Sequence, residues 1–320
     1  MKIAFISDLH VDSSLKNLTL LDYLLERLAL LTPDTFIIAG DIAANPQLFE
    51  QTLQKFSPLT CHKLLVAGNH DIWIDSEESV HHGIHSGIKY REIIPRICER
   101  NNFIYLGLEP CVIQGIGFAG TIGWYDYTLR NKKYDSMFSM DTYRNKQYQD
   151  KFTWNDLYFA HWMDAHTNIR KSDEEVAHEM ESSLKNQLQS LTQKGVTTIV
   201  VVTHHVPFST MVFYPNTLPF DFFSAYMGSE GLGEVILTER TVTHVICGHS
   251  HIKSSLTIGT AQAMKSPVGY TLEWRGKNVA KIVEERLTCF ETSSQSPLSP
   301  YERRMPDERQ LRMGRENIKS

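Results

Sequence analysis

The chain has 320 residues, of which 42% are hydrophobic and 22% are charged, and its formal net charge is −5 at pH 7. This composition is typical of an ordinary globular protein. The net negative charge argues against a protein that holds nucleic acid by bulk positive charge, although it leaves a local basic groove open.

Apolar runs with helical patterns between them predict a β-α-β-α-β unit over about the first seventy residues. Leucines recur at helical spacing from Leu18 to Leu31, and Pro33 ends that run. This order of elements predicts parallel neighbouring strands. The expected elements are strands at 2–7, 35–39 and 63–67 and helices at 18–31 and 48–56.

The rest of the chain continues this alternation but contains one unusual stretch. Residues 120–170 are dense in tryptophan, tyrosine and phenylalanine, with charged residues between them, and we expect them to form a cap over the ends of the strands. The helix expected after this stretch is ended by Gly195. The other expected elements are helices at 90–100 and 174–193 and strands at 103–105, 111–114, 116–119, 197–203 and 243–247.

Short polar motifs directly follow five of these strands. Open α/β folds bind ligands at the carboxyl edge of the sheet, so five motifs at five strand ends predict one common site. Burying so many carboxylates and imidazoles together is unfavourable without cations, which indicates a metal site. The motifs are, in order, Asp8-Leu9-His10, Gly40-Asp41, Gly68-Asn69-His70-Asp71, His204-His205 and Gly248-His249-Ser250-His251.

The donor atoms of these motifs predict the kind of metal centre. They are oxygens and imidazole nitrogens without thiolates, a set that suits Mn, Fe, Zn or Ni, and we favour Mn. Seven donors suit two divalent ions that share a carboxylate, and such pairs clamp the attacking and leaving oxygens of a displacement at phosphorus. The predicted reaction is therefore metal-assisted hydrolysis of a phosphate ester. The candidate ligands are Asp8, His10, Asp41, Asn69, His204, His249 and His251.

The five motifs in this order resemble the calcineurin-like metallophosphoesterase superfamily, whose pattern is D-x-H, G-D, G-N-H-[DE], a single His and G-H-x-H. The resemblance spans residues 1–251 and implies that Asp41 bridges the two metals. It implies that His70 donates a proton to the leaving oxygen and that Asp71 orients the His70 ring. The implied ligands are Asp8, His10, Asp41 and His251 for one metal, and Asp41, Asn69, His204 and His249 for the other.

Two points of the site concern neighbouring residues. Adjacent residues on an extended strand point in opposite directions, so only one of His204 and His205 can face the metals. The residues leave this choice open; we favour His204, because the family often carries H-x-x-P here and Pro207 has that spacing. His205 is then a candidate to contact the phosphate. Trp124 and Tyr125 are also candidates for substrate contact, with packing inside the cap as the alternative.

The resemblance implies a four-layer α/β/β/α sandwich with the aromatic-rich cap inserted at about 120–170. We expect a metallophosphoesterase domain over residues 1–290. The tail over 291–320 is polar and low in apolar residues, so we expect it to be disordered or loosely docked. Four short runs after His251 resemble the antiparallel strands that close the second sheet of the family, at 255–258, 261–264, 270–274 and 279–284.

The expected activity is that of a metal-dependent phosphoric ester hydrolase with a slight preference for phosphodiesters of a nucleotide or nucleic acid. His70 would protonate a poor leaving group, and the aromatic rings of the cap could hold a base. Phosphomonoesterase or pyrophosphatase activity on a small metabolite or a phosphoprotein is the alternative, because fold analogy does not choose between substrates. A non-catalytic scaffold is a further alternative, but it predicts missing ligands, and none is missing.

We expect a cytoplasmic protein without a membrane partner. The opening apolar run is one strand long and is followed by Asp8, which predicts no signal peptide. No stretch approaches the ~20 apolar residues of a membrane span. The five cysteines form no CxxC pair, which is typical of a reducing compartment. No pattern in the sequence indicates an oligomeric state.

Overall fold

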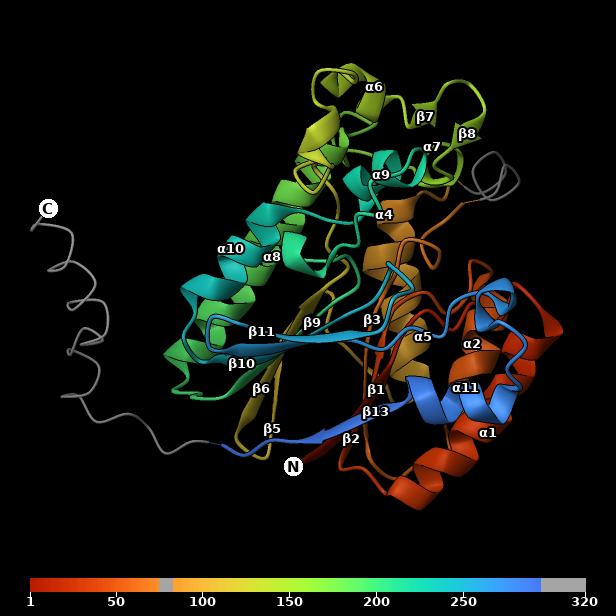
Figure 1. The fold of residues 1–320 in the computed structure, drawn as a ribbon. Coiled ribbons are helices and arrows are strands. Elements are labelled where there is room, and N and C mark those ends of the chain that lie inside the picture. Colours follow the sequence, from red (N-terminus) through yellow and green to blue (C-terminus); the bar gives the residue numbers. More distant parts are fainter. Residues whose placement is uncertain (75–82, 295–320) are drawn as a thin grey trace, which may run out of the picture.

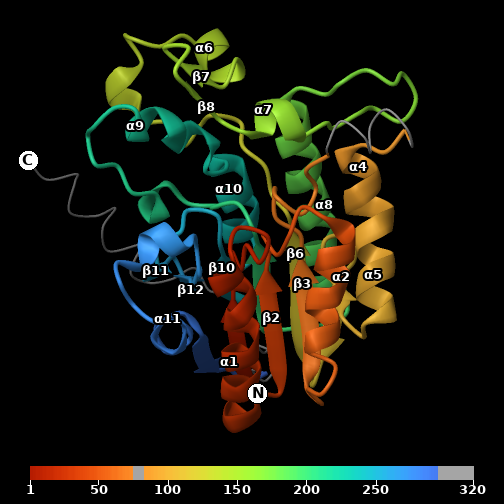
Figure 2. The same ribbon diagram turned by 90° about the vertical axis from the view of Figure 1, so that its right-hand side faces the viewer.

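The computed structural model describes residues 1–74 and 83–294. Two β-sheets lie face to face, and helices cover the outer face of each sheet, which gives four layers (Figures 1 and 2). Buried side chains from both sheets fill the space between them, among them Phe5 and Ile37 from one sheet and Phe118 and Val200 from the other. The predicted α/β/β/α sandwich is therefore confirmed.

The first sheet has the strand order β13-β1-β2-β3-β4. Strands β1 to β4 are parallel to their neighbours, and β13 pairs with β1 in antiparallel fashion. All residues of β2 are buried, as expected for a parallel strand that is covered on both faces. The bounds are β1 (Lys2–Ile6), β2 (Thr35–Ala39), β3 (His62–Val66), β4 (Ile104–Tyr105) and β13 (Thr288–Glu291).

The second sheet has the order β11-β12-β10-β9-β6-β5. Its four central strands are parallel, and the outer strands β5 and β11 are antiparallel to their neighbours. The carboxyl ends of β9 and β10 therefore point in one direction. The bounds are β5 (Cys111–Ile113), β6 (Ile116–Thr121), β9 (Ile199–Thr203), β10 (Val242–Cys247), β11 (Ser254–Ile258) and β12 (Ala261–Lys265).

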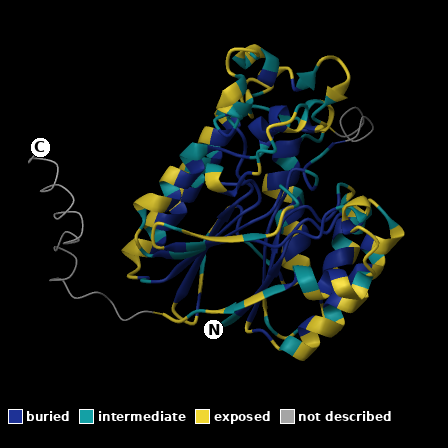
Figure 3. Ribbon diagram, viewed as in Figure 1, coloured by how far each residue is buried: buried dark blue, intermediate teal, exposed yellow. Residues whose placement is uncertain are grey.

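The helices bury one face each against the sheets, as the colours of Figure 3 show. In α1, Leu20, Leu21, Leu24 and Leu28 are buried, and the Ser14 side chain accepts a hydrogen bond from the N–H of residue 17 at the start of the helix. The first sheet is covered by α1 (Leu15–Leu31), α2 (Pro46–Lys55), α4 (Ser86–Ile88), a π-helical turn (Lys89–Ile93), α5 (Ile94–Arg100) and α11 (Val279–Arg286), and the second by α8 (Asp173–Gln193) and α10 (Glu230–Thr238). No helix in the described ranges is long and apolar enough to cross a membrane.

The chain between β6 and α8, residues 122–172, is the cap. Figure 1 shows its elements gathered at one end of the molecule, beyond the sheets, together with α9 from the β9–β10 connection. The aromatic side chains of Trp124, Tyr125, Tyr127 and Tyr143 are buried there and pack with Tyr226. The bounds are α6 (Met140–Arg144), β7 (Gln147–Tyr148), β8 (Phe152–Thr153), α7 (Asp156–Phe159) and α9 (Phe220–Phe223).

The end of the chain differs from the prediction. Residues 254–258 and 261–265 are strands, as predicted, but β12 is parallel to β10 rather than antiparallel. The other two predicted strands are not strands: residues 270–274 contain a 3₁₀ turn (Thr271–Trp274), and residues 279–284 lie in α11. In α11 the buried residues Ile282 and Val283 follow Val279 at helical spacing, and Asn278 caps the first turn. Such short apolar runs fit a strand or a helix equally well. Strand β13 was not predicted, and the predicted tail lies outside the described residues from 295 onward.

Candidate metal centre

The motifs lie at the carboxyl ends of β1, β2, β3, β9 and β10. The backbone turns sharply where several of these strands end: the φ angles are 54° at Asp8, 43° at His10, 57° at Asp41, 69° at His249 and 51° at His251. A left-handed backbone at a residue other than glycine is uncommon and costs about 1–3 kcal/mol, and such strain collects at functional sites. The turns direct side chains from both sheets toward one edge.

Two motif glycines are required because the strand ends approach each other closely. Gly40 has a φ of +86°, and a Cβ atom there would lie 2.5 Å from Nδ1 of His204. A Cβ atom on Gly68 would lie 2.1 Å from Oδ1 of Asp41. Any side chain at either position would therefore displace one of the candidate ligands.

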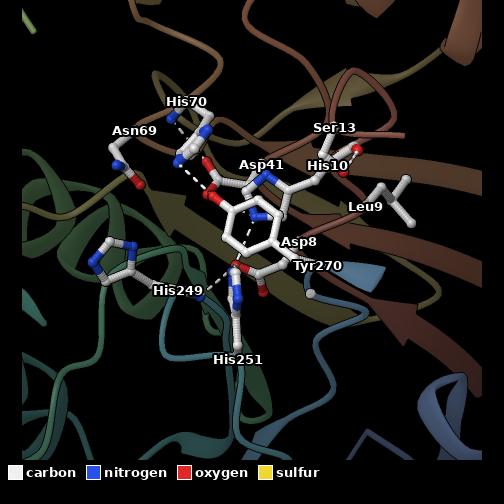
Figure 4. A network of polar contacts seen from close by, with 12 residues as sticks. Asp8, Leu9, His10, Ser13, Asp41, Asn69, His70, His249, His251 and Tyr270 are labelled. Atoms are coloured by element: carbon white, nitrogen blue, oxygen red, sulfur yellow. Dashed lines mark hydrogen bonds and ion pairs between the residues drawn. The ribbon is translucent and has the colours of Figure 1, made fainter. Parts of the chain in front are cut away.

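Six of the candidate side chains, with His70, form three overlapping groups whose ligand atoms lie within 4.8 Å of one another. Figure 4 shows most of this set around one point. His10 and Asp41 each belong to two of the three groups and so link them. The groups are Asp8, His10 and His251; His10, Asp41 and His70; and Asp41, His204 and His249.

The first set of donors surrounds Nε2 of His251. This atom lies 3.0 Å from Nε2 of His10 and 3.5 Å from Oδ1 of Asp8. Nε2 of His10 also lies 3.6 Å from Oδ2 of Asp41. Four donors from three strand ends therefore come together on this side.

The second set of donors surrounds Nε2 of His204. This atom lies 3.3 Å from Oδ2 of Asp41, 3.1 Å from Oδ1 of Asn69 and 3.2 Å from Nδ1 of His249. The same Asp41 oxygen thus approaches His10 in the first set and His204 in the second. The structure therefore places Asp41 between the two sets.

Backbone carbonyls determine which nitrogen of two histidines is free to bind a metal. Nδ1 of His204 lies 2.9 Å from the carbonyl oxygen of Ala39, and Nε2 of His249 lies 3.1 Å from that of Tyr226. Because a carbonyl oxygen only accepts hydrogen bonds, each of these nitrogens carries the proton. The opposite nitrogens, Nε2 of His204 and Nδ1 of His249, face the cluster and are the ones that a metal would bind.

Burial and charge shift the pKa values in this cluster. Burial raises the pKa of Asp8 and lowers the pKa values of His10 and His249, so that each favours its neutral form. Burial is the strongest single influence on Asp41 and acts to raise its pKa, but the charges of His204, His70 and His10 and the hydrogen bond with His204 together hold that pKa well below its usual range. Burial would lower the pKa of His204, yet the Asp41 carboxylate raises it to about 9.

These residues fit a metal centre. The carboxylate and imidazole donors match the chemistry of Mn, Fe, Zn or Ni. Oδ2 of Asp8 is buried and has no hydrogen-bond partner among the described residues. Unpartnered polar atoms and clustered like groups in the interior are unfavourable, and bound divalent cations would offset both effects.

His70 lies on the side of the cluster that is open to solvent. Its backbone N–H donates to Oδ1 of Asp41 at 2.9 Å, and its ring stacks on Trp73 with 3.6 Å between the ring centroids. Nε2 of His70 lies 3.3 Å from the hydroxyl of Tyr270, which Figure 4 shows beside the ring. The ring is half-buried, so one nitrogen is held near the donor cluster and within reach of a bound molecule.

The role predicted for Asp71 needs correction. Its carboxylate is buried and accepts four backbone hydrogen bonds, which occupy both oxygens, so it has no free lone pair to orient the His70 ring. Asp71 instead holds the turn after β2, and with it the Asp41 backbone, against the turn after β3. The donors are the N–H groups of Asp41 at 3.0 Å, Ile42 at 2.7 Å, Ala43 at 3.0 Å and Gly68 at 2.8 Å.

The three predicted substrate contacts are also corrected. His205, Trp124 and Tyr125 are 0%, 1% and 0% exposed, so none of them is accessible to a substrate. His205 stacks behind His249 with 4.3 Å between the ring centroids, and Trp124 packs against His205 in turn. The alternative interpretation, packing inside the cap, holds for the two aromatic residues.

The sequence analysis missed Tyr270, Glu273 and Asp156. The Tyr270 ring stacks on His10, and the Glu273 carboxylate accepts from Nδ1 of His251 at 3.0 Å, which leaves Nε2 of His251 free. Asp156 contacts the amide of Asn69. Each lies outside the motifs, and the 270–274 segment was predicted as a strand, so no local pattern identified them.

Comparison with known proteins agrees with this geometry. Residues 1–253 match the model of the calcineurin-like phosphoesterase family. The crystal structure of phosphopantetheinyl hydrolase from Mycobacterium tuberculosis is similar with a TM-score of 0.68 and 18% identity, covering 96% of this chain and 98% of that one. At this identity the likeness shows a shared fold alone.

Weaker similarity extends to other phosphoesterases. A dimetal phosphatase from Danio rerio has a TM-score of 0.49 and 12% identity, covering 83% of this chain and 86% of that one. No curated protein matches the chain. The family model, in contrast, spans all five motifs and most of the chain. The chain therefore belongs to the calcineurin-like phosphoesterase family.

Proposed function

We propose that the protein hydrolyses phosphate esters with two divalent cations at the carboxyl edge of its sheets, and that Mn²⁺ is the favoured ion. The observation that carries this proposal is the convergence of seven donors from five strand ends on two adjoining positions that share Asp41. We also propose that residues 1–290 form the catalytic domain, because β13, near the end of that range, pairs with β1.

One cation would be held by Asp8, His10, Asp41 and His251, and the other by Asp41, Asn69, His204 and His249. Bound cations of this kind supply an activated water and neutralise charge at the phosphoryl oxygens. The protein contributes fixed orientation, because the carbonyls of Ala39 and Tyr226 hold the His204 and His249 rings in the required tautomers.

His70 is proposed to donate a proton from its ring to the departing oxygen. Its half-buried position beside Asp41, next to fully buried ligands, supports this role. The Tyr270 hydroxyl, 3.3 Å from Nε2, and the Trp73 ring limit how far His70 can move. General acid catalysis by such a group is typically worth about 10²–10⁴-fold.

A phosphodiester is the proposed substrate class. The charges that act most strongly on the pKa values of Asp8, His10 and Asp41 come from other histidines and carboxylates, not from lysine or arginine. The singly charged diester needs less neutralisation than the doubly charged monoester, and an alkoxide leaving group needs the proton that His70 would supply. The buried rings of Trp124 and Tyr125 give no support to a stacked base, so a nucleotide is not specified.

The test is hydrolysis of bis-p-nitrophenyl phosphate and of p-nitrophenyl phosphate by the purified protein. Mn²⁺, Ni²⁺, Zn²⁺ or Mg²⁺ is added in turn after removal of bound metal by a chelator. We expect metal-dependent turnover that favours the diester and disappears in Asp41→Ala. Tight metal binding without cleavage of either ester would contradict the proposed activity and favour a scaffold.

A further inference from the structure

A single buried carboxylate in the cap receives three neutral donors from around the metal centre. Asp156, the first residue of α7, is 1% exposed. Its Oδ1 accepts from Nδ2 of Asn69 at 3.0 Å and from Nε1 of Trp73 at 2.6 Å, and its Oδ2 accepts from Nε1 of Trp154 at 2.7 Å. In the described part of the chain no ion pair neutralises this carboxylate. Burying a charge without an ion-pair partner costs free energy. We therefore ask what these three hydrogen bonds do that an apolar residue could not.

The first of these bonds determines which atom of Asn69 faces the cluster. The two ends of a carboxamide have the same shape, but one donates and the other accepts. A carboxylate only accepts, so Asp156 requires the NH₂ end of Asn69 to point toward the cap. Oδ1 of Asn69 then points the other way and lies 3.1 Å from Nε2 of His204, among the second set of donors. Only the oxygen end can bind a cation.

The second bond reaches the proposed proton donor. The Trp73 indole, held at Nε1 by Asp156, stacks on the His70 ring at 3.6 Å with an interplanar angle of 28°. On its other side it contacts Phe159, the last residue of the same short helix, with 5.2 Å between ring centroids. The helix α7 therefore clamps Trp73, and Trp73 limits the tilt of His70.

We propose that Asp156 is a positioning residue through which the cap orients both the Asn69 ligand and, by way of Trp73, the His70 ring. This inference rests on the proposed function. It gives the cap a definite task at the metal centre, although the cap supplies neither a ligand nor a reacting group. Loss of the hydrogen bonds that orient a ligand typically lowers metal affinity or activity by about 10–100-fold.

The substitution Asp156→Asn tests the orientation directly. Its amide oxygen can serve only one side, so an NH₂ group must face a donor, either at Trp154 or at Asn69 and Trp73. In the second arrangement Asn69 can turn over and present NH₂ to the cation. Adding Trp154→Phe removes the donor on the first side, so the amide oxygen can remain with Asn69 and Trp73. The double variant should therefore recover what the single variant loses.

Calorimetric titration of the metal-free protein with Mn²⁺ provides a readout that does not depend on activity. We expect two sites in the wild type, about 10–100-fold weaker affinity at one site in Asp156→Asn, and recovery in Asp156→Asn with Trp154→Phe. Trp154→Phe alone keeps an aromatic ring beside His249 and should retain two sites, and it measures what loss of the indole does by itself. Asp173→Asn is the matched control, because Asp173, the first residue of α8, also accepts an indole N–H, from Trp124 at 2.9 Å, but within the described residues it contacts no candidate ligand.

The outcomes separate this inference from the proposed function. Absence of Mn²⁺ binding and of hydrolysis in the folded wild type overturns the proposed function. Two sites in the wild type with unchanged binding in Asp156→Asn overturn only the role of Asp156. Equal losses in Asp156→Asn and Asp173→Asn, or no recovery in the double variant, mean that the cap acts through general stability and also overturn it. If circular dichroism shows that Asp156→Asn is unfolded, a folded double variant with two wild-type sites supports the proposal, and an unfolded or single-site double variant overturns it.

Discussion

The edge of the sheets and the cap each contain a buried carboxylate at the metal centre, Asp8 and Asp156, and the hydrogen bonds of the two carboxylates differ. At the edge, Oδ1 of Asp8 accepts one backbone hydrogen bond while its Oδ2 has no partner. In the cap, both oxygens of Asp156 accept hydrogen bonds. Within the donor cluster the unused oxygen of Asp8 is available to a cation, whereas the saturated carboxylate of Asp156 holds its neighbours in place.

The backbone at the edge is strained at the ligands themselves. At the edge, five ligand residues adopt positive φ values at the points where the strands end. Such local strain persists only where the surrounding structure supports it. Behind that edge, the cap packs Tyr125, Tyr127 and Tyr226 against one another. The edge thus holds donors in an unfavourable arrangement that binding relieves, and the cap supplies the packing that keeps them there.

Asp41→Ala should have the largest effect, because Asp41 lies between both sets of donors. We expect metal-stimulated hydrolysis to fall to background, and Mn²⁺ binding to weaken at both sites in calorimetric titration. The metal-free variant should also unfold more easily than the metal-free wild type, because buried His204 loses its carboxylate partner and the backbone N–H of His70 loses its acceptor. Retention of one site at wild-type affinity would show that Asp41 serves only one ion.

His70→Ala should lower kcat by about 10²–10⁴-fold while Mn²⁺ affinity stays the same, because His70 is proposed to act on the substrate rather than on the metals. The loss should be greater for a phenyl ester than for a p-nitrophenyl ester, since the poorer leaving group depends more on protonation. Equal losses for the two esters would contradict a proton-donating role. The comparison of the two esters is made with each at saturating concentration.

Asp173→Asn should act on stability rather than on the metal centre. It leaves the Lys146 ammonium buried without its partner, because the lysine side chain is only 6% exposed. Removing one partner of a buried pair typically lowers the free energy of unfolding by about 3–5 kcal/mol, which urea denaturation would measure. Adding Lys146→Met should recover part of this loss. A fall in Mn²⁺ affinity with little change in the free energy of unfolding would contradict a purely structural role for Asp173.

Tyr270→Phe should have the smallest effect. The hydroxyl lies 3.3 Å from Nε2 of His70, and a hydrogen bond of this kind contributes about 0.5–1.5 kcal/mol, so kcat should fall roughly 2–10-fold. The ring remains stacked on His10, so Mn²⁺ affinity should not change. A loss of more than a hundredfold would place the hydroxyl in the chemistry itself.

Much of the fold could be predicted because its signals are local. The leucine stripe of α1, the glycine that follows α8 and the apolar runs of β1, β2, β3, β9 and β10 each lie within a short segment, and the structure has these elements within a few residues of the expected ends. The strand predicted at 279–284 was wrong, because the spacing of Val279, Ile282 and Val283 fits a strand or a helix. Only the packing of α11 against α1 selects the helix.

The sequence by itself determined the family and the set of donors that meet at the edge, because each motif follows directly after its strand and parallel strands end on the same side. Only the tertiary structure decided which histidine of the pair faces the cluster, that Trp124 and Tyr125 are buried, and that Tyr270, Glu273 and Asp156 support the site. Asp156 meets Asn69 across 87 residues and Tyr270 meets His70 across 200, and contacts over such separations arise from packing rather than from any local pattern.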